Sequence, residues 1–411
     1  MNKNDAYASL RIKDYRLFIL AKFLSTIGIQ MQSVIVGWQI YQLTHDALSL
    51  GLIGIAEAIP FFCVTLFAGH IADIVSRKRI IVLSNLLYVI CAAALLIIST
   101  NLHPALAQYG AAPIYFIIFI TGIARGFMQP ALTAFAAQLV PRELFGNAST
   151  WNSLVWQIAE ITGPAIGGLV YGFFGVGAAY SLVTILTTIG LGFFAFVEKK
   201  NIPEKSKKEN IWQSLSTGLK FVFSNQIILS AITLDMFAVF FGGAVAVLPI
   251  FADQVLHVGA KGLGFLRAAP AVGAIFMSIF QAHYPPFKKA GKNLLYCVFG
   301  FGLFMILFAV IHNFYIVLFV LMAAGAFDNV SVVIRHTIIQ LYTPDEMRGR
   351  VSSINGIFLG SSNELGSFES GVAAKIMGLI PSVIFGGSMT LGVVGLTARF
   401  APKLRKLTLY T

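Results

Sequence analysis

Ionisable side chains interrupt the long apolar stretches of this sequence, and they are the groups most able to do chemistry there. A charge at the centre of a lipid bilayer costs roughly 2.5–3.5 kcal/mol, so each one needs a partner or a function. Counting residues from the ends of the stretches places four of these side chains near mid-depth: Arg125, Glu160, Asp328 and Glu364. Three others lie nearer one end of their stretch: Glu57, Arg267 and Asp235. Arg335 and Glu369 are further candidates.

The composition indicates which solvent surrounds these charges. Of 411 residues, 57% are apolar and only 11% are charged, whereas soluble domains carry roughly 25% charged residues. A soluble protein of this composition would expose large apolar patches to water, so the solvent must be lipid.

Twelve apolar stretches of about 20 or more residues lie between Leu17 and Arg399. Each is long enough for a helix to cross about 30 Å of hydrocarbon at roughly 1.5 Å per residue. The stretches are continuously apolar rather than alternating, which favours helices over the strands of a barrel. We therefore predict an all-α membrane protein with twelve transmembrane helices, including spans at 149–172, 176–197 and 351–379.

The longest polar stretch, Glu198 to Gln226, divides the spans six and six. Its second part, IWQSLSTGLKFVF, has the apolar spacing of an amphipathic helix on the inner interface, or of an extra turn of the seventh span. We predict two pseudo-symmetric six-helix bundles joined by a cytoplasmic linker that contains this segment, with the bounds 1–197, 198–225 and 226–411.

The two halves also repeat in sequence. A shift of 210 residues pairs Gly54 and Pro60 with Gly264 and Pro270, and Glu57 with Arg267. A shift of 203 residues pairs five positions of one loop with five of another: Pro141, Glu143, Gly146, Ser149 and Asn152 with Pro344, Glu346, Gly349, Ser352 and Asn355. Matches at nearly one offset, in corresponding loops, favour duplication.

Basic residues set the predicted orientation. With Met1 in the cytoplasm, 23 of the 29 Lys and Arg residues fall in inner segments, and Lys261 alone falls in an outer loop. This bias predicts a multi-pass protein of the inner membrane with both termini cytoplasmic. The net charge of +12 then reflects orientation and lipid attraction, and we expect no nucleic-acid partner.

The loop after the second span reads GHIADIVSRKRIIVL. Its glycine, acid and basic cluster resemble the loop signature of the major facilitator superfamily. The resemblance implies a gating role at the inner mouth for Gly69, Asp73, Arg77 and Lys78. A second inner loop, TPDEMRGRVSSINGIF, resembles the enterobactin-exporter branch of that superfamily, and it adds the predicted gating residues Glu346, Arg348 and Arg350.

The fifth span holds EITGPAIGGLVYG, which resembles the superfamily's exporter-associated GPxxGG element. Gly163, Pro164, Gly167 and Gly168 would kink the span and allow close helix packing. Arg125 matches the superfamily's membrane-embedded arginine, which the resemblance links to proton transfer.

A proton-coupled carrier needs a carboxylate whose pKa is raised by burial and lowered by a mobile cation. We predict Glu160 with Arg125 for this role, and Asp235, Asp328 and Glu364 are alternatives. The alternative that each of these charges belongs to a permanent structural ion pair stays open. Glu57 and Arg267 are predicted to belong to an outer gate, with local partners such as Lys375 or Glu160 rather than each other.

Several aromatic and amide side chains lie near the spans that are expected to line a cavity, and they would suit a large aromatic or amphipathic solute. They are Gln30, Trp38, Trp151, Phe237, Phe241 and Asn363. Helix packing or lipid contact would explain the same aromatic residues.

The leading hypothesis is a proton-coupled exporter, driven by the proton gradient without a cofactor or metal. Importing a nutrient, or flipping lipids, stays open. A membrane enzyme is disfavoured because H-E-x-x-H, G-x-S-x-G and Walker-A motifs are absent from the sequence. We expect a monomer whose partners are a small-molecule substrate, protons and membrane lipids.

Overall fold

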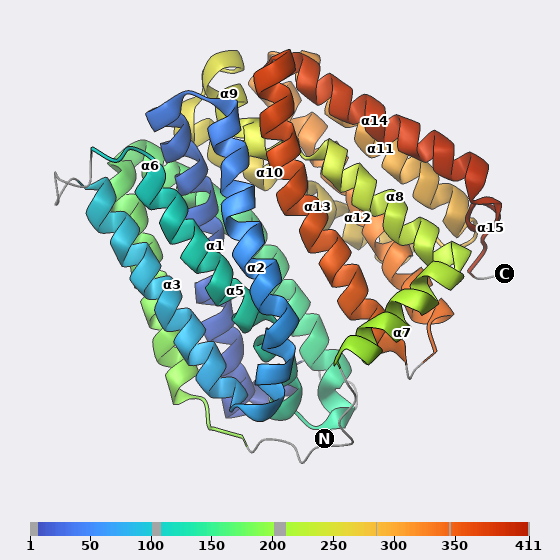
Figure 1. Ribbon diagram of the computed structural model, residues 1–411, viewed down its shortest axis with the longest axis horizontal. Coiled ribbons are helices and arrows are strands. Elements are labelled where there is room, and N and C mark those ends of the chain that lie inside the picture. The colour runs from blue at the N-terminus through green and yellow to red at the C-terminus, as the bar shows by residue number, and fades with distance from the viewer. Residues whose placement is uncertain (1–6, 101–107, 201–210, 285, 345–346, 410–411) are drawn as a thin grey trace. The chain divides into compact units, whose positions relative to one another are not determined.

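A computed structural model describes residues 7–100, 108–200, 211–284, 286–344 and 347–409. These residues form long helices joined by short turns, and no strand occurs among them (Figure 1). The N-terminal helices are η1 (Ser9–Arg11), α1 (Lys13–Thr44), α2 (Ala47–Ile74), α3 (Arg77–Ser99), α5 (Ala112–Leu139), η2 (Arg142–Leu144) and α6 (Phe145–Phe196).

The remaining helices begin at residue 211. They are α7 (Ile211–Ser224), α8 (Gln226–Gly242), η3 (Ala244–Val247), α9 (Leu248–Ile250), η4 (Phe251–Val255), α10 (Gly259–His283), α11 (Ala290–Val310), α12 (Phe314–Tyr342), α13 (Arg348–Met377), α14 (Leu379–Phe400) and α15 (Pro402–Arg405).

Ten helical segments of the described residues are long and apolar enough to cross a membrane. One of them contains α6, whose 52 residues would extend about 78 Å if straight, more than twice the hydrocarbon core. The backbone breaks at Gly175, where φ is 83° and ψ is 177°. Two helical segments therefore meet at Gly175, between the predicted spans 149–172 and 176–197.

The predicted span at 351–379 coincides with α13, a 30-residue helix that is not among the ten candidates. Its sequence contains serines, Asn355, Asn363, Glu364 and Glu369, which lower its apolar character. The class of all-helical membrane protein is confirmed, whereas the count of twelve spans stays a prediction.

Contacts divide the chain into two compact units. Unit 1 comprises Met1–His45, Ile55–Ser206 and Gly259–Ala268, and unit 2 comprises Asp46–Gly54, Lys207–Val258 and Ala269–Thr411. The first turns of α2 therefore pack with unit 2, and the first turns of α10 pack with unit 1. The predicted division at 197 and 226 stays a prediction.

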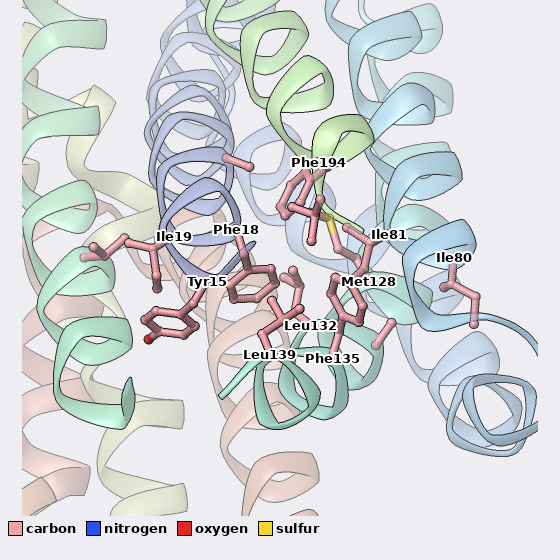
Figure 2. Packing of buried hydrophobic residues seen from close by; sticks show 14 of the residues in the cluster. Tyr15, Phe18, Ile19, Ile80, Ile81, Met128, Leu132, Phe135, Leu139 and Phe194 are labelled. Carbon is pink, nitrogen blue, oxygen red and sulfur yellow. The ribbon is translucent and has the colours of Figure 1, made fainter. Parts of the chain in front are cut away.

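Unit 1 is held together by aromatic side chains from several helices. Phe18 of α1 contacts Phe135 of α5 and Phe194 of α6, each at 6.0 Å between ring centroids. Tyr15 donates a hydrogen bond of 2.6 Å to the backbone oxygen of Ala148 in α6. Figure 2 shows these rings gathered in one apolar cluster, which fixes the position of α1 against α6.

Unit 2 buries a second cluster contributed by α8, α11, α12 and α14. Asn225 caps α8 by accepting hydrogen bonds from the backbone N–H groups of Ile227 and Ile228. Because Asn225 is extended, with φ of −103° and ψ of 102°, α7 is a separate helix and not an extra turn of α8. Gly218 of α7 packs against Arg350 and Ile354 of α13.

Candidate functional site

Arg125 of α5 and Glu57 of α2 form an ion pair in unit 1. The Nη1 atom of Arg125 donates to Oε1 of Glu57 at 2.7 Å, and the guanidinium lies 5.0 Å from the centre of the Phe61 ring. Gly122 permits the approach, since a Cβ there would come 2.5 Å from the backbone oxygen of Glu57. The paired side chains remain 31% and 26% exposed, so the pair is only half-buried within the protein.

Lys375, the predicted partner of Glu57, pairs elsewhere, so that prediction is wrong. Its Nζ lies 3.0 Å from Oδ1 of Asp46 within unit 2. Burial alone would raise the pKa of Asp46, but hydrogen bonds from Lys375 and Ser49 hold that pKa below its usual value. Glu57 belongs to the part of α2 that packs in unit 1, whereas Asp46 lies just before α2, in the segment that packs in unit 2.

Asp235 of α8 and Arg335 of α12 form an ion pair inside unit 2, where their side chains are 6% and 1% exposed. Arg335 lies 210 residues after Arg125, which is the offset that relates Pro60 to Pro270. The two halves therefore carry equivalent arginines with different partners. The Arg125–Glu57 pair is half-buried, and the Arg335–Asp235 pair is fully buried.

Glu160 lies on α6 with its side chain exposed. The Trp156 side chain hydrogen-bonds to Glu160, and Arg267 of α10 is close enough for their charges to interact. The Nη2 atom of Arg267 also donates to Oγ of Ser33 in α1 at 2.8 Å. The structure thus gathers an accessible carboxylate and a cation from two helices of unit 1.

Asp328 and Glu364 are half-buried on α12 and α13, and each has at least one further interaction. The backbone of Glu364 touches Gly54 at the start of α2. As proton-coupling residues, Asp328 and Glu364 stay predictions.

The four residues of the GPxxGG element are buried at helix crossings. A Cβ at Gly163 would lie 2.6 Å from Cβ of Gln30, and one at Gly167 would lie 3.1 Å from Cα of Met31. Pro164 removes a backbone donor between them. Gly163 and Gly167 therefore let α6 lie directly against α1.

Arg77 and Lys78 at the start of α3 bind backbone oxygens near the ends of other helices. The Nη1 atom of Arg77 donates to Ala134 of α5 at 3.2 Å, and the Nζ atom of Lys78 donates to Ala195 of α6 at 2.7 Å. Cations are favoured near helix C-termini, where carbonyl groups are unpaired. Both residues therefore tie helices of unit 1 together.

Other predicted gating residues are described only in part. Gly69 and Asp73 lie in α2, but their side chains are outside the described part, as is the side chain of Arg348. Glu346 lies outside the described residues. The Nη1 atom of Arg350 lies 3.5 Å from Sδ of Met347. Their gating role stays a prediction.

The predicted cavity residues divide by exposure. Trp38 is 5% exposed and packs against Tyr41, and its role in a cavity stays a prediction. Phe237 and Phe241 stack at 6.2 Å, with Phe237 37% exposed.

Gln30 packs at Gly163, the Trp151 ring lies 5.6 Å from the tilted ring of Tyr7, and Asn363 is exposed. Among the described residues, no group of His, Cys, Asp or Glu side chains could hold a metal ion.

The family described as transmembrane secretion effector matches residues 4–408 of this chain, nearly its whole length. The chain belongs to this major facilitator family. The chain is therefore a multi-pass membrane transporter of small molecules and not an enzyme.

Two relatives of this chain are both named as enterobactin exporters. Enterobactin exporter EntS of Shigella flexneri is 26% identical over 346 residues, covering 83% of this chain and 80% of that protein. Enterobactin exporter EntS of Shigella dysenteriae serotype 1 is 25% identical over 351 residues, with the same two coverages. The predicted resemblance to the enterobactin-exporter branch is confirmed.

Solved structures show the same fold. A POT family transporter in complex with 5-aminolevulinic acid gives a TM-score of 0.76 at 12% identity, covering 95% of this chain and 96% of that one. A bacterial homologue of the human lysosomal transporter Spinster gives 0.69 at 14% identity, covering 96% of each chain.

Lys22 is a charged residue of a predicted span that was not among the predicted site residues. Lys22 lies in α1, and its Nζ donates to Oδ1 of Asn152 in α6 at 2.5 Å. Within the described residues, no carboxylate lies at ion-pairing distance from Lys22. A lysine inside the apolar stretch that starts at Leu17 was a sufficient signal to include it.

Proposed function

We propose that this protein exports a hydrophobic or amphipathic small molecule, such as a siderophore or drug, in exchange for protons. Transport proceeds by alternating access in the cytoplasmic membrane of a bacterium, with both termini in the cytoplasm. The chain works as a monomer and takes its energy from the proton gradient, without a cofactor.

The outward direction is supported by the relatives and by the fifth predicted span. The two relatives are named as enterobactin exporters, which favours a siderophore-like solute. Gly163 and Gly167 of the exporter-associated GPxxGG element make close contacts with α1 in this chain, and Gly168 makes one with α10. An importer has no comparable support in the described contacts.

Proton coupling is supported above all by the position of Glu160. Its carboxylate is exposed, accepts a hydrogen bond from Trp156 and lies near the charge of Arg267. Arg267 is also bonded to Ser33, so it has an alternative partner when Glu160 is protonated. Asp235, by contrast, is held in a fully buried pair with Arg335 and is a poor acceptor of protons from water.

Glu160→Gln should abolish coupling without abolishing solute movement. In proteoliposomes, uptake driven by a pH gradient is expected to fall by about ten-fold or more, because glutamine cannot exchange a proton. Counterflow of labelled solute at equal pH on both sides should stay within about two-fold of wild type, since binding and alternation need no net proton movement.

Glu143→Gln is the matched control, because Glu143 is an exposed carboxylate outside the long helices. It should leave both assays unchanged. Gradient-driven transport that survives Glu160→Gln would exclude Glu160 as the coupling residue. Equal loss in both assays would assign it to binding or folding instead.

A further inference from the structure

The Lys22 contact is unusual because the cation faces a neutral partner. Its Nζ is bonded to the amide oxygen of Asn152, and no described carboxylate is near enough to balance the charge. By the helical rise, Lys22 lies about 14 Å from the start of α1 and about 8 Å from Leu17, where the apolar stretch begins. An amide dipole compensates a buried ammonium group only in part.

The internal repeat shows that the fold does not require this lysine. The offset of 210 residues relates Lys22 to Ile232, a buried apolar residue of α8. The offset of 203 residues relates Asn152 to Asn355. The second half thus keeps the asparagine without a lysine partner at the equivalent position, so Lys22 is an addition specific to the first half.

Lys22 also lies beside an accessible polar surface. On α6, Ser149, Ser153, Trp156 and Glu160 are exposed at spacings of four, three and four residues, which places them on one helical face. Serine and glutamate on an otherwise apolar helix indicate a face that meets water rather than lipid. Asn152, the partner of Lys22, adjoins this stripe.

The matching stripe of α1 runs from Lys22 through Ile29 to Ser33, at spacings of seven and four residues. Ser33 is exposed and binds Arg267. Asn152 and Glu160 are separated by about 12 Å along α6, from the helical rise. A solute could therefore contact Lys22 without displacing the Glu160–Arg267 group.

We propose that Lys22 binds an oxyanion of the transported solute, a catecholate or a carboxylate, and so makes acidic solutes the preferred class. The inference rests on the proposed export function, since it names the solute class of the same carrier. Asn152 holds the ammonium in place while the site is empty. An arriving oxyanion then supplies the charge that the protein does not provide.

Four compounds with one skeleton separate the two anions. They are 2,3-dihydroxybenzoate, its methyl ester, 2,3-dimethoxybenzoate and methyl 2,3-dimethoxybenzoate, which carry both acidic groups, the catechol, the carboxylate or neither. Their binding to the full chain in lipid nanodiscs is measured by equilibrium dialysis in mildly alkaline buffer. Wild type should bind at least one acidic compound more tightly than the neutral one.

Lys22→Gln should weaken binding of the preferred acidic compound by about ten-fold while changing the neutral compound by less than about two-fold. Lys22→Arg should restore most of the affinity, because it keeps the charge. Lys220→Gln, which removes an exposed lysine of α7, is the matched control and should change nothing.

Equal weakening of acidic and neutral compounds would show a structural role and overturn the proposal. So would unchanged binding in Lys22→Gln, or a wild type that does not prefer acidic compounds. Export of the preferred acidic compound against its concentration gradient, measured in proteoliposomes, tests the export function separately. Failure of wild type in that assay, with intact discrimination at Lys22, would reject the export proposal and keep the anion site.

Discussion

Arg335→Met is expected to destabilise the protein by about 3–5 kcal/mol, because it leaves Asp235 charged and buried without a partner. Asp235 and Arg335 are 6% and 1% exposed on α8 and α12, so neither can turn to water when the other is removed. The expected observation is a large fall in the thermal unfolding midpoint in detergent, with little folded protein at growth temperature.

The double variant Asp235→Leu and Arg335→Met should recover much of that stability. Removing both charges eliminates the unpaired group, and apolar replacements of buried pairs are often neutral or stabilising. Glu57→Leu provides the comparison. Its partner Arg125 is 31% exposed and can be solvated, so the single change should cost much less. A double variant as unstable as Arg335→Met would contradict this account.

The sequence predicted which residues are charged within the membrane but not how they pair. Arg125 and Arg335 occupy equivalent positions, yet the residue equivalent to Glu57 is Arg267, which would repel Arg335. Asp235 supplies the missing charge from α8, where the equivalent residue of α1 is Ser25. Pairing depends on which helices touch, and hydropathy carries no information about that.

Helix type and location were predictable because continuous apolar stretches permit few other structures in lipid. The bounds of the helices were harder to predict. Gly175 joins two predicted spans in one segment, and α13 is polar enough to fall outside the candidate spans. At the site, Glu160 was predicted from its depth and from its place one span along from Arg125. Arg267, for which Glu160 was predicted as a local partner, lies near Glu160 because the first turns of α10 pack with unit 1.

Gly168→Val should reduce transport to about a tenth or less, since overpacking by one or more methyl groups costs about 1–3 kcal/mol even where side chains can move. A Cβ at Gly168 would lie 2.6 Å from Cα of Gly264 and 2.7 Å from the backbone oxygen of Ala260. Both are backbone atoms, so α6 and α10 would have to separate. Transport per mole of reconstituted protein measures the loss.

The repeat provides a second crossing of the same kind in unit 2. Gly371 of α13 lies 203 residues after Gly168, and a Cβ there would come 2.7 Å from Cα of Gly51 in α2. Gly371→Val should therefore reproduce the defect. Gly192→Val in α6 is the control, because a Cβ at Gly192 would meet nothing within 4 Å. If Gly192→Val impaired transport as strongly, helix propensity rather than close backbone contact would explain the effect. Full activity in Gly168→Val would show that this contact is dispensable for transport.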